Sequence, residues 1–134
     1  MDKQLSKFNA RVLVVENYAI NAELTTAMLK MMKCKVDVAE NGREALLFLT
    51  RFAYDIIFMD IEMPILDGCQ TTIEIRKNEQ DKKHIPIIAL TANALAGDQE
   101  KYMSCGMDGF INKPLKFIDL EFILNKFIPN KKVE

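Results

Sequence analysis

Apolar residues in this chain gather in short runs that alternate with longer stretches of helical periodicity. Each run is four to six residues long, which is typical of a strand buried on both faces. We predict five such strands, at residues 11–16, 36–39, 55–59, 85–90 and 109–112. A polar segment follows each run, so the sheet would be built from repeated strand–helix units.

The segments after these runs carry apolar residues at spacings of three and four, which predicts amphipathic helices. We expect the buried stripe of the first helix to consist of Ile20, Leu24, Ala27, Met28 and Met31. The other helices would cover residues 43–52, 69–79, 97–105 and 117–127. Each helix would lie between two strands or follow the last one.

This alternation predicts an α/β fold with a five-stranded parallel sheet that is covered by helices on both faces. The number of units favours a flavodoxin-like, doubly wound (βα)5 sheet. The chain is too short for the β/α barrel, which has eight such units and needs about 250 residues. We expect a single domain over residues 1–134, with an ordered core at about 10–128 and polar tails at both ends.

Charge and hydropathy narrow the classes of function. The 18 Lys and Arg residues nearly balance the 19 Asp and Glu residues, and this argues against a general nucleic-acid binder. No apolar run approaches the ~20 residues that span a bilayer, and the first residues lack the apolar segment of a signal peptide. We therefore expect a cytoplasmic protein that binds neither nucleic acid nor membrane directly.

The chain contains three cysteines, Cys34, Cys69 and Cys105, and one histidine, His84. They are far apart in the sequence and form no C-x-x-C pair, so the spacing of a zinc site is missing. We predict reduced and mostly buried thiols.

Polar residues stand where four of the five predicted strands end. Glu16 and Asn17 follow the first strand, Asp60 the third, Thr91 the fourth and Lys113 the fifth. The carboxyl ends of parallel strands meet at one edge of an open sheet, and ligands bind there. We therefore expect these side chains to lie around one site.

The residue types at this edge point to phosphoryl chemistry. A carboxylate can attack phosphorus and form an aspartyl phosphate. Carboxylates also attract Mg²⁺, which together with a lysine neutralises phosphoryl oxygens, and a threonine hydroxyl can donate a hydrogen bond to them. The sequence has no P-loop and no dinucleotide glycine fingerprint, so no nucleotide is implied.

Four segments carry a resemblance to a known family. They are VLVVE ending at Glu16, DIIFMDIEMPILDG at 55–68, IIALTA at 87–92 and FINKP at 110–114. With these segments in this order the chain resembles a response-regulator receiver domain of two-component signalling, over nearly its whole length. It is also similar to the receivers of hybrid histidine kinases.

The resemblance implies that Asp60 is the residue that accepts a phosphoryl group from a phosphohistidine donor. Mg²⁺ would be held by Glu16, Asp60, the backbone carbonyl of Glu62 and, weakly, Asn17. The loop after Asp60 would edge the site with Met63 and Pro64. Such a domain is not an enzyme in the usual sense, since it performs at most its own phosphorylation and dephosphorylation.

The same resemblance implies a conformational switch. Thr91 and Lys113 would bind the phosphoryl group, and Phe110 would change its rotamer as Thr91 moves. The peptide bond between Lys113 and Pro114 would be cis. The surface from about residue 94 through the last helix would then bind a downstream protein.

One position departs from the family pattern. Receivers usually place two adjacent acids after the first strand, whereas here the second is Asn17. Its amide can offer Mg²⁺ a neutral oxygen but no charge. We expect weakened Mg²⁺ binding and slower phosphorylation rather than their loss.

Three classes of function stay open on these grounds. The favoured one is a phosphoacceptor whose partners are a histidine kinase or a histidine phosphotransfer protein and a downstream protein, as a monomer or weak dimer. The second is a pseudo-receiver that binds proteins without phosphorylation because Asn17 replaces an acid. The third is a phosphatase of the haloacid-dehalogenase kind, which Glu62 disfavours because that family has a second Asp at this position.

Overall fold

The computed structural model describes residues 5–61, 63, 67–79, 83–92 and 96–133 of the chain. A five-stranded parallel sheet forms its centre, in the order β3-β2-β4-β5-β6. The strands are β2 (Arg11–Val15), β3 (Lys35–Ala39), β4 (Ile56–Asp60), β5 (Ile87–Thr91) and β6 (Gly109–Asn112). The helices are α1 (Ala19–Met31), α2 (Gly42–Arg51), α3 (Gly68–Glu79), α4 (Ala96–Ser104) and α5 (Phe117–Phe127). Within these ranges no helix is long and apolar enough to cross a membrane.

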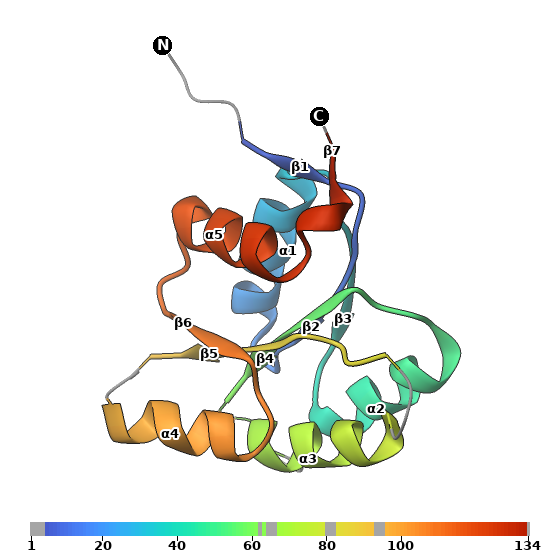
Figure 1. Ribbon diagram of the computed structural model, residues 1–134, viewed down its shortest axis with the longest axis vertical. Helices are drawn as coiled ribbons and strands as arrows, with labels where there is room; N and C mark the ends of the chain where they lie inside the picture. The colour runs from blue at the N-terminus through green and yellow to red at the C-terminus, as the bar shows by residue number, and fades with distance from the viewer. Residues whose placement is uncertain (1–4, 62, 64–66, 80–82, 93–95, 134) are drawn as a thin grey trace.

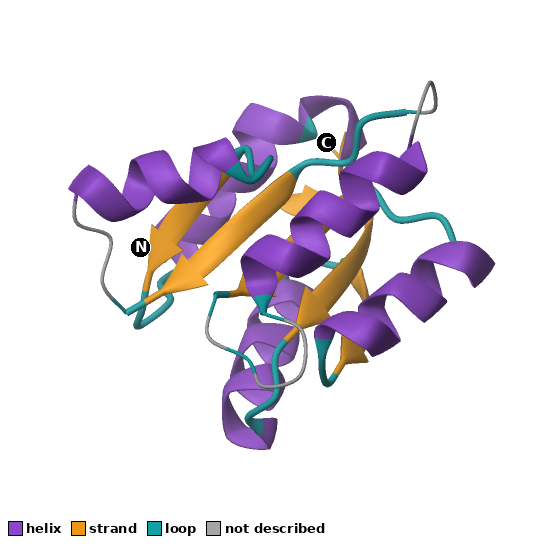
Figure 2. Cartoon of the chain, turned by 90° about the horizontal axis from the view of Figure 1, so that it is seen from below, coloured by secondary structure: helices purple, strands orange, loops and turns teal. Residues whose placement is uncertain are grey.

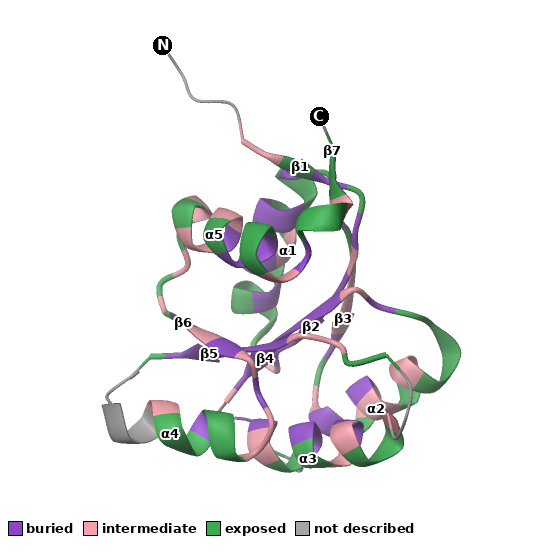
Figure 3. Ribbon diagram, in the orientation of Figure 1, coloured by how far each residue is buried: buried purple, intermediate pink, exposed green. Residues whose placement is uncertain are grey.

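The helices cover both faces of the sheet, with α1 and α5 on one side and α2, α3 and α4 on the other (Figures 1 and 2). Side chains alternate along each strand, so that Val12 and Val14 enter one core and Leu13 and Val15 enter the other. Figure 3 shows the central strands β2, β4 and β5 as buried, while β3 and β6 at the two edges of the sheet are partly exposed. The flavodoxin-like fold expected from the sequence is confirmed.

The two ends of the described chain pair with each other. Strand β1 (Lys7–Phe8) runs antiparallel to β7 (Lys132–Val133), which follows the short 3-10 helix Pro129–Lys131. Phe8 is fully buried and packs in the core beneath α1 and α5. The ordered structure therefore extends past the expected core at about 10–128 at both ends, because Phe8 anchors the first segment and β7 pairs with it.

The buried face of α1 also differs from the expected one. Of the predicted stripe only Met28 is buried, whereas Ile20, Leu24 and Met31 are 80, 53 and 59% exposed. The helix turns a different set of residues toward the sheet, namely Ala22, Thr25, Met28 and Leu29. Small residues such as alanine and threonine let the helix approach the sheet closely, while Ile20, Leu24 and Met31 lie on its outer side.

This assignment of faces predicts opposite results for two leucines of α1. Leu29→Ala removes a fully buried side chain and should lower the free energy of unfolding by about 2–5 kcal/mol. Leu24→Ala should change it by about 0.5 kcal/mol or less, since Leu24 is already half in water. Urea unfolding followed by circular dichroism measures both. Equal losses for the two variants would contradict the observed packing of α1.

Candidate functional site

The carboxyl ends of four strands bring the predicted site residues to one edge of the sheet. Asp60 is the last residue of β4 and Thr91 the last of β5, and Glu16 and Lys113 directly follow β2 and β6. The parallel register pairs Val15 with Met59, Asp60 with Leu90 and Thr91 with Asn112. Residues distant in the sequence thus become neighbours through backbone pairing alone.

Lys113 links the two acids of this edge. Its Nζ lies 3.4 Å from Oε1 of Glu16 and 3.4 Å from Oδ1 of Asp60. The Glu16 and Asp60 side chains are almost fully buried, whereas that of Lys113 is 26% exposed. Two carboxylates facing one ammonium leave an excess of negative charge, which favours a further cation beside them.

Burial raises the pKa of Glu16 from its ordinary value of 4.5 to about 7. Desolvation is the largest cause, followed by a hydrogen bond to Asp60 and by the charge of Asp60, while Lys113 acts in the opposite direction. The backbone N–H of Tyr18 also donates to Oε2 of Glu16, at 3.4 Å, and favours the charged form. Burial and the neighbouring Asp60 therefore both favour the neutral form of Glu16.

Asn17 contributes an unsatisfied oxygen beside these acids. Its Oδ1 is buried and, within the described structure, has no hydrogen-bond partner. Asn17 and Glu16 line a cavity of about 310 Å³ together with residues of α1 and β3. A buried acceptor without a donor is unfavourable unless another group, such as a cation, meets it.

The oxygens at this edge suit Mg²⁺, although few of them are charged. Among the described residues no group of three or more His, Cys, Asp or Glu side chains is placed to hold a metal ion. The available donors are the carboxylates of Glu16 and Asp60 and the amide oxygen of Asn17. Mg²⁺ prefers oxygen ligands and keeps several waters, so one or two carboxylates suffice for it.

Thr91 makes a contact that the sequence analysis missed. Its side chain is buried, and its Oγ1 lies 3.0 Å from the hydroxyl of Tyr102, a buried residue of α4. Phe110 of β6 is half-buried and packs against the core cluster that contains Tyr102. Nothing in the local sequence marks Tyr102, because its role depends on how α4 is placed against β5.

The start of α3 is pressed against the end of β4. A Cβ atom on Gly68 would lie 2.8 Å from the backbone oxygen of Asp60, which is closer than real contacts allow. Only glycine therefore permits this approach. Oδ1 of Asp67 accepts a hydrogen bond of 2.8 Å from the N–H of Gln70, so Asp67 shapes the first turn of α3.

Two further expectations concern the loops of the site. The peptide bond between Lys113 and Pro114 is cis, as the resemblance implies. Met63 is buried, at 8% exposure. Glu62 and Pro64, which were assigned to the metal site and to the loop, lie outside the described residues.

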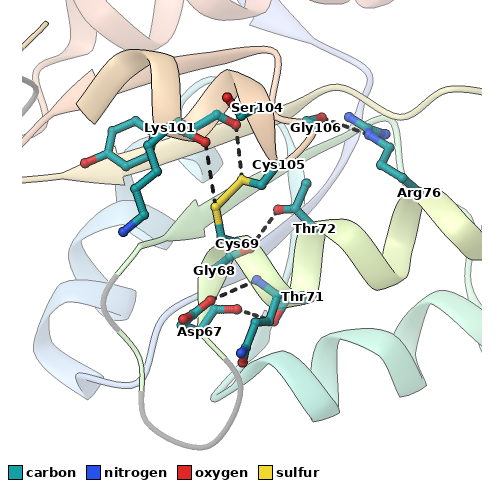
Figure 4. The surroundings of a disulfide bond; sticks show 12 residues. Asp67, Gly68, Cys69, Thr71, Thr72, Arg76, Lys101, Ser104, Cys105 and Gly106 are labelled. Carbon is teal, nitrogen blue, oxygen red and sulfur yellow. Dashed lines mark hydrogen bonds between the residues drawn. A yellow bond between two sulfur atoms is a disulfide. The ribbon is translucent and has the colours of Figure 1, made fainter. Parts of the chain in front are cut away.

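The prediction of three reduced thiols is wrong for two of them. Cys69, in the first turn of α3, and Cys105, directly after α4, form a disulfide (Figure 4). They are 36 residues apart in the sequence, and only the packing of α3 beside the end of α4 brings them together. Cys34 is buried and free, and burial raises the pKa of its thiol to about 11.

His84 is not one of the residues of this site, and its ring pairs with Asp108 instead. Its side chain is 57% exposed, and its Nε2 is 2.8 Å from Oδ1 of Asp108. Asp108 also pairs with Arg76 of α3, so His84 belongs to an ion network that fixes the segment before β5. Among the described residues it joins no group of His, Cys, Asp and Glu side chains that could hold a metal ion.

Comparison with known sequences places most of the chain in one family. Residues 12–125 match the response regulator receiver domain. The chain is 36% identical over 132 residues to hybrid signal transduction histidine kinase G of Dictyostelium discoideum. The matched segment covers 96% of this chain but only 4% of that kinase. It is 31% identical to probable histidine kinase 1 of Oryza sativa subsp. indica, of which it spans 16%.

Solved structures agree with this assignment. The receiver domain of the sensor histidine kinase PA1611 of Pseudomonas aeruginosa, which has a magnesium ion coordinated in its active-site cleft, is 37% identical and superposes with a TM-score of 0.80 over 90% of this chain and 98% of that one. The receiver domain of Ssk1 from Saccharomyces cerevisiae, crystallised with the histidine phosphotransfer protein Ypd1, gives 0.86 at 26% identity, over 98% and 95% of the two chains. By sequence and by structure, this chain belongs to the response regulator receiver domain family of two-component signalling.

Proposed function

We propose that this receiver domain takes up a phosphoryl group on Asp60 from a phosphohistidine donor and thereby switches a protein-binding surface. The observation that carries the proposal is the buried pair of Glu16 and Asp60 facing Lys113 at the carboxyl edge of the sheet. Such a site offers a carboxylate nucleophile next to a fixed positive charge. The cytoplasmic location stays a prediction from the sequence.

The transfer step needs no redox partner. A carboxylate oxygen of Asp60 attacks the phosphorus of the donor phosphohistidine and forms a new P–O bond. The P–N bond breaks, its electron pair returns to the imidazole ring, and the ring ends as neutral histidine with a proton taken from water. Lys113 is placed to pair with the phosphoryl oxygens, whose charge dominates such a transition state.

Glu16, Asp60 and Asn17 would hold a Mg²⁺ ion, and the backbone carbonyl of Glu62 stays a predicted ligand. Bound there, the ion would supply positive charge next to the phosphoryl oxygens. Asn17 suits the role because its buried oxygen has no other partner in the described structure. It brings no charge, however, so we propose a weaker metal site than a pair of adjacent acids would give.

Thr91 provides the link to the rest of the domain. Its hydroxyl has one proton, and Tyr102 is its present neighbour at 3.0 Å. Once that proton is donated to a phosphoryl oxygen, Thr91 can only accept from Tyr102. The arrangement of α4 and the rotamer of Phe110 would then be biased by the phosphoryl group, which is how a local charge shifts a two-state element.

The donor would dock on the outer face of α1. An apolar surface on this face consists of Tyr18, Ile20 and Leu24, each more than half exposed. It starts two residues after Glu16 and so lies next to the site. A phosphohistidine must come within bonding distance of Asp60, and a partner that covers α1 would bring it there. Exposed Ile118 and Phe122 on α5 are candidates for the downstream surface.

A pseudo-receiver is the second candidate, and Asn17 is the observation that favours it. If the missing charge abolishes metal binding, the same fold would present its surfaces without phosphorylation. The experiments below separate the two cases.

The first prediction concerns phosphorylation itself. Incubation with phosphoramidate and Mg²⁺ should add one phosphoryl group to the intact mass, because Asp60 is the nucleophile. The added mass should be absent from Asp60→Asn and should be lost with hydroxylamine, which cleaves acyl phosphates. A folded wild-type chain that gains no mass would sink the phosphoacceptor proposal and leave the pseudo-receiver.

The second prediction concerns the metal. Asn17→Asp restores a charge where Asn17 has only a neutral oxygen, and Mg²⁺ should bind about tenfold more tightly or better, since a unit charge at 4 Å is worth up to about 4 kcal/mol. Calorimetric titration measures this affinity. Asn125→Asp makes the same change on the exposed side of α5 and serves as the control. An unchanged affinity in Asn17→Asp would show that Asn17 does not limit the site.

The third prediction concerns docking. Leu24→Ala should slow transfer from a phosphorylated histidine phosphotransfer protein by about tenfold, as expected for an apolar contact at an interface centre. The rate with phosphoramidate should not change, because Leu24 does not touch Asp60. Leu47→Ala, which is similarly exposed on the opposite side of the sheet, is the matched control. If both leucine variants transfer equally fast, α1 is not the docking face.

A further inference from the structure

The disulfide between Cys69 and Cys105 joins the two elements that border the phosphorylation site. Cys69 lies in the first turn of α3 and Cys105 directly follows α4, with their Cα atoms 5.5 Å apart. Both residues are half-buried, so a small oxidant or reductant can reach them. Figure 4 shows the bond bridging the end of α4 and the start of α3.

Each end of this bond is tied to a site residue by a short path. Cys69 follows Gly68, which packs directly on the backbone of Asp60 and whose N–H donates to the oxygen of Ile61 at 3.3 Å. Cys105 follows Tyr102 by three residues, and the hydroxyl of Tyr102 lies 3.0 Å from Oγ1 of Thr91. The disulfide thus closes a covalent loop over residues 69–105, which contains Thr91 and begins one residue after the glycine that packs on Asp60.

We propose that Cys69 and Cys105 form a reversible thiol–disulfide site, and that its oxidation by a peroxide holds α4 against α3 and keeps the hydroxyl of Tyr102 beside Thr91. Oxidation state would therefore decide how freely Thr91 leaves Tyr102. The effect of this on phosphorylation rests on the function proposed above, whereas the crosslink and its effect on α4 do not.

The two sulfur atoms are not equivalent. The partial positive charge at a helix N-terminus favours a thiolate, and Cys69 is at that end of α3. Cys69 is therefore the thiol that attacks hydrogen peroxide, which leaves Cys69 as a sulfenic acid and releases hydroxide. The thiol of Cys105 then attacks the sulfenic sulfur, the S–S bond forms, and the departing hydroxyl group leaves as water. Two thiols are oxidised, and the peroxide is reduced to two waters.

The structure also accommodates the reduced pair. The sulfur of Cys105 lies 3.1 Å from the carbonyl oxygen of Tyr102, and that of Cys69 lies 3.9 Å from the carbonyl oxygen of Lys101. On reduction each sulfur gains a proton, and each has a carbonyl of the last turn of α4 within reach of its S–H. On reduction the two sulfurs must move apart from bonding distance, and these carbonyl oxygens are acceptors for their S–H groups.

Cys34 is set apart from this chemistry. It is buried under α1, and burial and the charge of Asp55 raise the pKa of its thiol to about 11, so little thiolate forms near neutral pH. Thiolate is the reactive form toward peroxide. Cys34 therefore serves as an internal control for the reactive pair.

The test compares the reduced chain with the chain oxidised by hydrogen peroxide. Oxidation should remove two hydrogen atoms from the intact mass and protect Cys69 and Cys105, but not Cys34, from alkylation after unfolding. Dithiothreitol should reverse it. Hydrogen exchange of α4 amides should then be about tenfold slower in the oxidised chain, because the crosslink suppresses local opening. Cys34→Ala should behave as wild type. Cys105→Ser should gain oxygen at Cys69 instead of forming a bond, and neither Cys69→Ser nor Cys105→Ser should show slower exchange of α4 after peroxide.

Two results would overturn the proposal. One is a folded, reduced chain in which peroxide produces no Cys69–Cys105 bond. The other is a bond that forms but leaves the exchange of α4 unchanged. Both readouts work without phosphorylation, so they stand even if Asp60 accepts nothing. If Asp60 is phosphorylated, the oxidised chain should also react with phosphoramidate severalfold more slowly than Cys105→Ser in the same peroxide.

Discussion

Two buried carboxylates, those of Glu16 and Asp60, face a single lysine ammonium at the edge of the sheet. Removing such charges from water is costly, and one lysine does not compensate both. The strands nevertheless hold the two acids together, because the pairing of β2 with β4 sets their positions. The site therefore favours positive charge, and the proposed Mg²⁺ ion would supply it next to the two acids.

Backbone packing carries this constraint outward from Asp60. The approach of Gly68 to the Asp60 oxygen fixes where α3 begins, and so fixes the position of Cys69. On the neighbouring strand, the contact of Thr91 with Tyr102 fixes the last turn of α4. Helix α3 is thus positioned by the end of β4 and helix α4 by the end of β5, so a crosslink between the two helices would act on both strand ends.

The sequence alone predicts where the strands lie along the chain and which polar residues stand at their ends, since apolar runs and strand-end polarity are local signals. It failed where the outcome depended on packing between distant segments. The spacing of apolar residues in α1 suggested a stripe with Ile20 and Leu24, but the helix buries Ala22 and Leu29. The periodicity of apolar residues does not distinguish a helix face that packs on the sheet from an apolar face that stays exposed. The Cys69–Cys105 bond and the Tyr102 contact depend on how α4 lies beside α3 and β5, which no local pattern encodes.

Oxidation and phosphorylation would act on the same hydroxyl from opposite sides. The disulfide would hold α4 so that Tyr102 stays beside Thr91, while a phosphoryl group on Asp60 would draw the Thr91 proton toward itself. Two influences on one equilibrium are reciprocal: if the crosslink makes phosphorylation less favourable by some factor, phosphorylation makes the crosslink less favourable by the same factor. A phosphorylated domain would then be reduced more readily. In this view the redox pair requires no separate output, because it acts through the threonine that the phosphoryl group uses.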